Sequence, residues 1–274
     1  MADANSGRSA TSAEEIGCGR ADPHHHVESR SLMCGRYISR VEAGIEREWM
    51  LRHQPPLFES WNIAPTAQVP IVRQQPEGRE VALVRWGLVP FFAKGEPLKR
   101  KSPTGRMVPA STHNARIETF ETAPSYRGPW KRGQRCLQIA SGFFEWHTFE
   151  DGRKAPFYIH LADQDTYAFA SLWDRSEKPD GTIIESCTII TMPANELMHH
   201  IHNTGSNPHR MPAMLKREDH DVWLNGTVDE ARAALHQYDQ GLMVAFEVAT
   251  RVNSTKNNGA ALIEPAPAFQ IQPR

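Results

Sequence analysis

The stretch that decides the fold is the pair of segments YAFASLW (167–173) and TIIESCTIITM (182–192), with Pro179, Asp180 and Gly181 just before the second segment. Both segments are rich in β-branched and aromatic residues, which favour β-strands, and Pro-Asp-Gly is typical of a turn. The connection is too short for a helical crossover, so the pattern predicts two antiparallel strands.

Segments of the same character lie on both sides of this pair. They are VALVRW (81–86), LQIA (137–140), FYIHL (157–161) and LMVAFEV (242–248). Gaps of hairpin length outnumber helical crossovers between these segments. We therefore expect a single α+β domain with a largely antiparallel central sheet and peripheral helices.

Helical patterns are fewer. Residues 39–51 begin with Ser-Arg-Val-Glu, which resembles a capping box that opens an amphipathic helix. A second helix is expected over 193–202. A third should follow Thr227, because a Glu three residues later completes a capping box ahead of apolar residues at helical spacing.

The two ends of the chain lack such patterns. Residues 1–32 contain no Phe, Trp or Tyr and show neither a helical nor a strand period, so we expect a disordered leader. We expect one domain over 33–264 and a tail over 265–274. Within the domain, residues 94–113 hold six basic residues, counting His113, against one acidic residue, which predicts an exposed basic loop.

The composition excludes several classes of protein. The chain has 274 residues and a mass of 30.9 kDa, and its 31 Lys and Arg nearly balance 32 Asp and Glu. No stretch reaches the roughly 20 apolar residues that a membrane span needs, and the N-terminus lacks the apolar core of a secretory signal. Four cysteines are too few for a disulfide scaffold, so we expect a cytoplasmic protein with reduced thiols. The neutral charge balance excludes wholesale electrostatic binding of nucleic acid but not a local basic patch.

Two residues suggest chemistry, and each has a structural alternative. Cys34 follows an internal methionine in MCGRY, where it could equally be a buried structural cysteine. Glu145 lies between aromatic residues in GFFEW. Burial there would make its carboxyl group a candidate general acid or base, whereas a place on an edge strand would simply expose it to water.

The histidines and tryptophans carry weaker signals. Four histidines cluster in MHHIHNTGSNPHRMP, but no C-x-x-C or H-E-x-x-H pattern accompanies them, so we expect no metal site and no cofactor. Most tryptophans of a domain this size lie in the core, although one or two could stack on bases. The candidates are Trp61, Trp86, Trp130, Trp146 and Trp173.

A series of motifs in a fixed order is more specific than any of these residues. It comprises MCGRY (33–37), WNIAPT (61–66), RWGLVP (85–90), NARIET (114–119), GFFEW (142–146), LWD (172–174), ITMPAN (190–195), IHN with RMP (201–212) and VN (252–253). The series resembles the SOS-response-associated peptidase family, also called abasic-site processing proteins, over residues 33 to about 255. The resemblance implies a compact α+β domain around an antiparallel, barrel-like sheet.

The resemblance also implies a covalent chemistry for Cys34. In the family, this cysteine becomes N-terminal once Met is removed and bonds to the aldehyde of an abasic site in single-stranded DNA. An α-amine with a pKa near 7.7–8.0 is partly neutral at pH 7, so it can condense with the aldehyde to an imine. The neighbouring thiol can then close a five-membered thiazolidine, which makes the bond durable.

Three further residues would move protons or orient the sugar by this resemblance. Asn114 matches the asparagine that orients the N-terminal residue, and Glu145 matches the acidic catalytic residue, which could also support strand cleavage by β-elimination. The family histidine would shuttle a proton at the sugar ring oxygen, a task suited to a pKa near 6.5. An insertion leaves both His202 and His209 as candidates; we favour His202, because Ile-His-Asn suits the end of the preceding helix.

DNA contacts are implied for three other residues. Arg36 and Arg116 match family positions that contact DNA. Trp86 matches a tryptophan that stacks on a base, an interaction that tolerates any sequence on a single strand. The partner implied is therefore single-stranded DNA with abasic sites, bound by a cytoplasmic monomer that associates with the nucleoid when it holds DNA.

The leader before Cys34 departs from the family pattern, since an acylated nitrogen cannot form an imine. Translation could start at Met33, the leader could be removed by self-cleavage, or the chain could be inactive in crosslinking; we favour the first. The alternative functions are a cysteine-type peptidase that uses the same residues on other chains, and a binding module without catalysis.

Overall fold

The two strands expected between residues 167 and 192 form a hairpin. In the computed structural model, which describes residues 35–267, they are β11 (Tyr167–Glu177) and β12 (Ile183–Pro193), paired antiparallel with Trp173 opposite Cys187. Most side chains in the central parts of both strands are buried, because the sheet that they join is covered on both faces there. The expected hairpin is confirmed.

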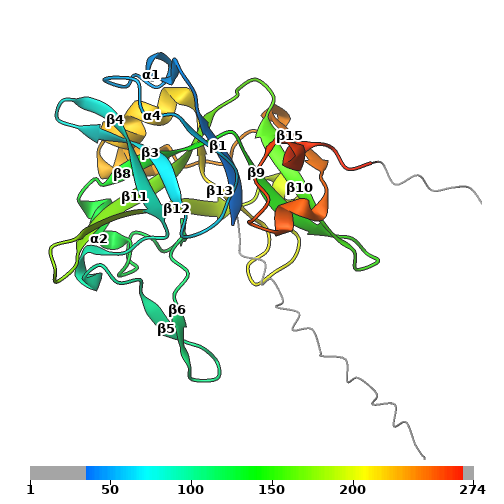
Figure 1. Cartoon of the computed structure of the whole chain (residues 1–274), viewed down its shortest axis with the longest axis horizontal. Coiled ribbons are helices and arrows are strands. Elements are labelled where there is room, and N and C mark those ends of the chain that lie inside the picture. Colours follow the sequence, from blue (N-terminus) through cyan, green and yellow to red (C-terminus); the bar gives the residue numbers. More distant parts are fainter. Residues whose placement is uncertain (1–34, 268–274) are drawn as a thin grey trace, which may run out of the picture. The chain divides into compact units, whose positions relative to one another are not determined.

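This hairpin and three further strands close into a five-stranded barrel (Figure 1). The ring runs from β12 to β4 (Gly78–Trp86), β3 (Gln68–Gln75), β8 (Arg135–Ala140) and β11, and then back to β12. All the pairings in the ring are antiparallel except the one between β4 and β12. The ring closes between β4 and β12 through two residue pairs, Arg85 with Ser186 and Trp86 with Cys187. The expectation of an α+β fold with a largely antiparallel, barrel-like sheet is confirmed.

Three short strands extend the barrel, and five other strands form a second sheet. The short strands are β7 (Asn114–Arg116) and β13 (Arg210–Pro212), which pair with β12, and β14 (Met214–Leu215), which pairs with β11. The second sheet has the order β15 (Met243–Glu247), β10 (Lys154–Leu161), β9 (Gly142–Thr148), β1 (Arg36–Val41) and β2 (Phe58–Ile63). The chain passes from the barrel to this sheet through Ser141, between β8 and β9.

Apolar residues form two buried clusters. The larger includes barrel residues such as Ile71, Leu137, Phe169 and Ile190, which are almost wholly shielded from solvent. The smaller packs residues of the second sheet against C-terminal segments; its members are Ile38, Phe144, Tyr158, Val248, Val252 and Leu262. Each large side chain buried in this way stabilises the fold by about 1.5–3 kcal/mol.

Five short α-helices lie at the periphery. They are α1 (Ile45–Glu48), α2 (Arg127–Lys131), α3 (Glu196–Ile201), α4 (His220–Asn225) and α5 (Val228–Ala233). Short 3-10 turns accompany them at η1 (Phe91–Ala93), η2 (Arg217–Asp219), η3 (Gln240–Leu242), η4 (Thr250–Asn253) and η5 (Ala260–Ile263). The expected capping box of Thr227 is confirmed, with its side chain and that of Glu230 each bonding the other's backbone N–H. The helix expected over 193–202 is confirmed in a shorter form, because Asn195 caps it.

The prediction of a helix over 39–51 was wrong. Ser39 lies in β1, where it is fully buried and opposite Ser60 of β2. Only Ile45–Glu48 is helical, after Gly44 at a φ of 90°. Pairing of the segment on both edges, with β2 and β9, outweighs the local capping signal.

The basic segment also differs from the loop expected there. It contains a hairpin of β5 (Lys99–Lys101) and β6 (Met107–Pro109), which is exposed as expected. The expected leader (1–32), the domain start at Met33, Cys34 and most of the expected tail lie outside the described residues. No helix within residues 35–267 combines the length and apolar character that crossing a membrane requires.

Candidate functional site

A buried carboxyl group faces a buried imidazole at the junction of β9 and α3. Glu145 lies in β9 and His202 is the residue that ends α3; both side chains are almost wholly shielded from solvent. The Nε2 atom of His202 lies 3.9 Å from an Oε atom of Glu145. This burial answers the question left open by the sequence, since Glu145 does not point to water. A carboxyl group and an imidazole at this separation can exchange protons with a ligand between or beside them.

The chain after α3 fixes the ring of His202. Its Nδ1 atom lies 3.1 Å from the carbonyl oxygen of Arg210 and 3.4 Å from the backbone nitrogen of Arg210, which leaves Nε2 towards Glu145. Arg210 is itself held by two hydrogen bonds to Glu118, of 2.8 and 2.9 Å, and by one to the carbonyl of Thr191. Burial acts to raise the pKa of Glu118, but the hydrogen bonds from Arg210 outweigh it, and the pKa lies below its usual value.

The end of α3 is also tied to β9. The Nδ1 atom of His147 lies 2.9 Å from the carbonyl of His200. Thr148 and Asn203 exchange two hydrogen bonds, of 2.9 and 2.8 Å, between backbone and side-chain amide. Because Glu145 and His147 are two residues apart in one strand, they point to the same side of the sheet. These bonds therefore hold the Glu145 side of β9 against the end of α3.

His209 lies elsewhere. Its ring stacks on that of His199 with centroids 3.8 Å apart, and its Nδ1 atom lies 3.0 Å from the carbonyl of His199. The structure thus brings His202, and not His209, beside Glu145. Within the described part of the chain, no three His, Cys, Asp or Glu side chains converge as a metal ion would require.

Asn114 and Arg116 lie in β7, which runs parallel to β12 with Asn114 opposite Ile189 and Arg116 opposite Thr191. The same strand β12 leads into α3, and the carbonyl of Thr191 receives a bond from Arg210. The β7 residues and His202 are therefore positioned by one strand. The side chain of Arg116 is exposed and donates to the side chain of Asn207, in the inserted loop after α3.

Arg36 opens β1, beside β9. It lies opposite Phe144, so the chain enters β1 next to the strand position of Glu145. Its guanidinium donates to the side chain of Asn62 at 2.8 Å and to the carbonyls of Val252 and Asn253 at 2.7 and 3.1 Å. Burial lowers the pKa of Arg36. Part of the Arg36 side chain remains accessible, so its anchored guanidinium can still meet a ligand.

The placement of Trp86 contradicts the stacking role expected for it. Trp86 is 0% exposed, its indole N–H donates to the carbonyl of His113 at 2.9 Å, and its ring packs edge-on to Tyr37 with centroids 5.2 Å apart. A ring buried on all sides cannot receive a base. Its role is in the core of the barrel.

The sequence analysis missed an exposed aromatic pair a few residues further on. Phe91 and Phe92 are 56% and 46% exposed, and their rings meet edge to face with centroids 5.6 Å apart. The guanidinium of Arg132 lies 5.0 Å from the ring of Phe91. No local signal marks this exposure, because the consecutive Phe143 and Phe144 of β9 are both buried.

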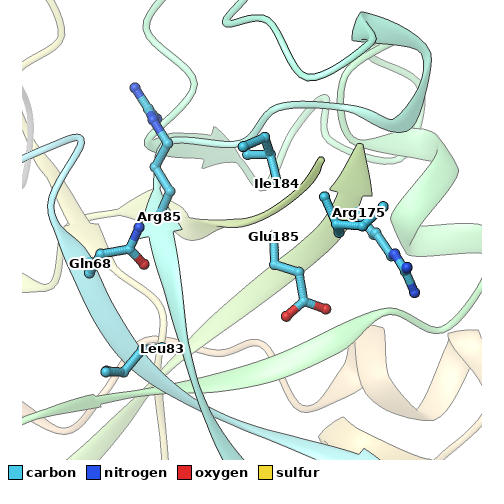
Figure 2. Close-up of a pocket in the computed structure, with 7 residues that line it drawn as sticks. Gln68, Leu83, Arg85, Arg175, Ile184 and Glu185 are labelled. Atoms are coloured by element: carbon cyan, nitrogen blue, oxygen red, sulfur yellow. The ribbon is translucent and has the colours of Figure 1, made fainter. Parts of the chain in front are cut away.

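A pocket of about 490 Å³ opens beside β4 and β12, and Figure 2 shows the side chains around it. The lining residues are Gln68, Leu83, Arg85, Arg175, Ile183, Ile184 and Glu185. The carboxylate of Glu185 is bound by Arg73 at 2.8 Å, and Arg85 donates to the carbonyl of Gly87 at 2.6 Å. None of the expected site residues lines this pocket, so it is separate from the pair of Glu145 and His202.

The fold and the site define a mixed α+β barrel protein with a buried carboxyl–imidazole pair beside its first strand. The chain belongs to the SOS response associated peptidase (SRAP) family, whose sequence profile matches residues 33–255. The resemblance found in the motifs is therefore confirmed.

Several relatives align with this chain over most of its length. Abasic site processing protein YoqW of Bacillus subtilis is 34% identical over 239 residues, which cover 85% of this chain and 99% of YoqW. Abasic site processing protein HMCES of Gallus gallus is 30% identical over 261 residues, which cover 84% and 72% of the two chains. A crystal structure of a Bordetella bronchiseptica protein superposes with a TM-score of 0.67 at 25% identity, covering 79% of this chain and all of that one.

Proposed function

We propose that this protein processes abasic sites in single-stranded DNA by capturing the sugar aldehyde covalently. The observation that carries the proposal is the buried pair of Glu145 and His202, 3.9 Å apart and oriented through Arg210. The relatives named abasic site processing proteins, which cover most of the chain, point the same way.

The nucleophile in this proposal is an N-terminal Cys34. Chain connectivity supports it: Cys34 is joined to Gly35, and Gly35 leads into β1, whose register with β9 brings the chain in beside Glu145. The α-amine attacks the open-chain aldehyde, and water leaves as an imine forms. The thiol then adds to the imine carbon, and its proton passes to the nitrogen, which closes the thiazolidine. The net change is the loss of one water.

The other residues take the proton and orientation steps. Glu145 moves protons during addition of the amine and loss of water, and His202 protonates the sugar ring oxygen as the ring opens. Asn114 orients the sugar and the amine. Arg36 and Arg116 bind phosphates next to the lesion, because both guanidinium groups are held at a surface and carry fixed charge.

Phe91 and Phe92 replace Trp86 as the stacking residues of this proposal. Their exposed rings can receive unpaired bases, which stack on aromatic side chains without regard to sequence. An abasic strand already lacks one stacked base, so bending it there costs less than in intact DNA. In this proposal the protein acts as a monomer.

Two further activities would use the same groups. Glu145 could abstract a proton from the captured sugar and so support strand cleavage by β-elimination. The Cys34 thiol could attack the carbonyl of the peptide bond before it, with the Cys34 nitrogen leaving as a free amine. Water would then hydrolyse the resulting thioester and release the leader, which would give the peptidase of the family name a meaning. A peptidase acting on other chains is the second candidate; it predicts turnover of added peptides by the same residues.

Adduct formation on a denaturing gel tests the proposal. Chains that start at Met1 and at Met33 are incubated with a single-stranded oligonucleotide that carries one abasic site. We expect the Met33 version to give a stable adduct and Cys34→Ala to give none, with Cys187→Ala as the matched control. An adduct of undiminished yield in Cys34→Ala overturns the proposal.

A further inference from the structure

The hairpin of β5 and β6 and its flanks carry a net positive charge, unlike the rest of the chain. Residues 94–113 contain five Lys and Arg against one Glu, whereas the rest of the chain holds 26 Lys and Arg against 31 Asp and Glu. Lys99, Arg100, Lys101 and Arg106 are all exposed. The hairpin is therefore strongly basic on a protein that is otherwise acidic.

These cations are not used by the fold. Guanidinium groups such as those of Arg73, Arg79 and Arg210 are ion-paired with carboxylates. Lys99, Arg100, Lys101 and Arg106, in contrast, form no ion pair with a carboxylate within residues 35–267. Four exposed charges of one sign on a short hairpin repel one another, so the fold gains nothing from them without an anionic partner.

The hairpin is nevertheless a defined structure. Lys99 pairs with Pro109, and Lys101 with Met107. The turn is closed around Ser102, whose N–H donates to the carbonyl of Arg106 at 2.8 Å and whose carbonyl accepts from Gly105 at 2.9 Å. The side chain of Ser102 accepts a further bond from the N–H of Arg106 at 3.1 Å. The charges are thus held on a preformed support.

The hairpin emerges between two parts of the proposed site. It follows the exposed Phe91 and Phe92 and leads, through the four residues after Pro109, into Asn114. The five chain steps from Pro109 to Asn114 span at most about 18 Å, and Lys101 lies two strand positions, about 7 Å, beyond Lys99. Figure 1 shows β5 and β6 projecting away from the barrel. The chain between the hairpin and Asn114 is thus long enough to place the charges several nucleotides from the site, at about 3.4 Å of rise each.

We propose that this hairpin, residues 98–110, grips the phosphates of the DNA strand several nucleotides away from the abasic site. The inference rests on the proposed function for the identity of the strand and extends it to a second contact on that strand. Lys99 and Lys101 point to the same side of β5 and can neutralise neighbouring phosphates. The hairpin supplies affinity that depends on salt and on strand length, and it takes no part in the chemistry.

The test compares two double variants of the full chain. Lys99→Ala with Lys101→Ala removes two hairpin charges, and Arg47→Ala with Lys216→Ala removes two exposed charges at α1 and before η2. Binding is measured by fluorescence anisotropy between 50 and 200 mM salt. The probes are a 25-nucleotide and a 7-nucleotide single strand, each with a central tetrahydrofuran, which mimics the abasic sugar but has no aldehyde.

Loss of two phosphate contacts on a single strand lowers the salt slope by about 1.4, since each contributes about 0.7. The advantage of the unsubstituted chain over the hairpin variant on the 25-nucleotide strand then shrinks about sevenfold from 50 to 200 mM salt. On the 7-nucleotide strand the two proteins should bind equally, and the control variant should match the unsubstituted chain on both strands.

Two results would overturn the proposal that the hairpin binds DNA phosphates. Equal salt slopes of the hairpin variant and the unsubstituted chain on the 25-nucleotide strand would show that the hairpin contacts no phosphate. The partner of its charges would then be an acidic protein surface. Equal losses on both strands show that the substitutions disturb the site itself. Adduct formation with an aldehyde-bearing strand is scored separately, so a hairpin-dependent slope without any adduct removes the proposed chemistry and leaves the grip standing.

Discussion

Glu145→Gln keeps the shape of a fully buried side chain and removes its ability to exchange protons. If Glu145 is the general acid and base of capture, the single-turnover rate of adduct formation should fall by about 10²–10⁴. The free energy of unfolding should change little by comparison, because Gln fills the same volume. Activity and stability are therefore expected to separate in this variant.

The distance to His202 sets the size of a second effect. Two unit charges 3.9 Å apart interact by about 4 kcal/mol at an effective dielectric constant near 20. A change in the protonation of either Glu145 or His202 during the reaction therefore changes the energy of the charged form of the other residue. The rate effects of Glu145→Gln and His202→Gln should be non-additive by about 1–3 kcal/mol in a double-mutant cycle.

The assay is single-turnover adduct formation on a denaturing gel, with urea unfolding of every variant. Glu247→Gln is the matched control, since Glu247 lies in the same sheet but pairs with Arg153 at the surface. It should leave the rate unchanged. A rate for Glu145→Gln within threefold of the unsubstituted chain, or additive effects of the two substitutions, would refute the reasoning.

Three predictions concern other parts of the chain. Burial, and next the charge of Arg79, lowers the pKa of His220 from 6.5 to about 4. Between these two pH values His220 is protonated in the unfolded chain and neutral in the folded chain. Stability is then full above pH 6.5 and is lost as the pH falls towards 4; urea unfolding should show about 2 kcal/mol less stability at pH 5 than at pH 7.5, and His220→Phe should reduce this difference, whereas an unchanged difference would rule out His220 as its source. Phe92→Ala should weaken strand binding by about 1–3 kcal/mol in anisotropy with little change in Tm, while Trp86→Ala should cost about 3–5 kcal/mol of stability; the reverse pattern would restore Trp86 as the stacking residue. Thr227→Ala removes the capping box of α5 and should cost about 1 kcal/mol in urea unfolding, with no loss meaning that the cap is frayed in solution.

Much of the barrel could be predicted because its strands carry their signal locally. The segments that became β8, β11 and β12 are dense in β-branched and aromatic residues, and turns bound them. β1 could not be found in this way, since Ser39 and Glu42 imitate a capping box and only pairing with β2 and β9 makes the segment extended. Closure of the barrel was also beyond local reasoning, because it depends on β4 meeting β12, about 100 residues later.

The site, too, could be predicted where the sequence carries a signal and could not where it depends on long-range packing. Motif order pointed to Glu145 and His202, and their meeting depends on how the inserted loop leaves α3, which the sequence restricted to two histidines. Trp86 was wrongly expected at a surface, because a motif does not report burial. Phe91 and Phe92 were missed for the converse reason: their exposure comes from the turn that follows β4.

Intact mass spectrometry tests the central claim most directly. The protein is purified and measured before and after incubation with a single-stranded oligonucleotide that carries one abasic site. The account predicts a chain that begins at Cys34 and gains the mass of the oligonucleotide less one water. A chain that begins at Cys34 but gains no mass under these conditions contradicts it.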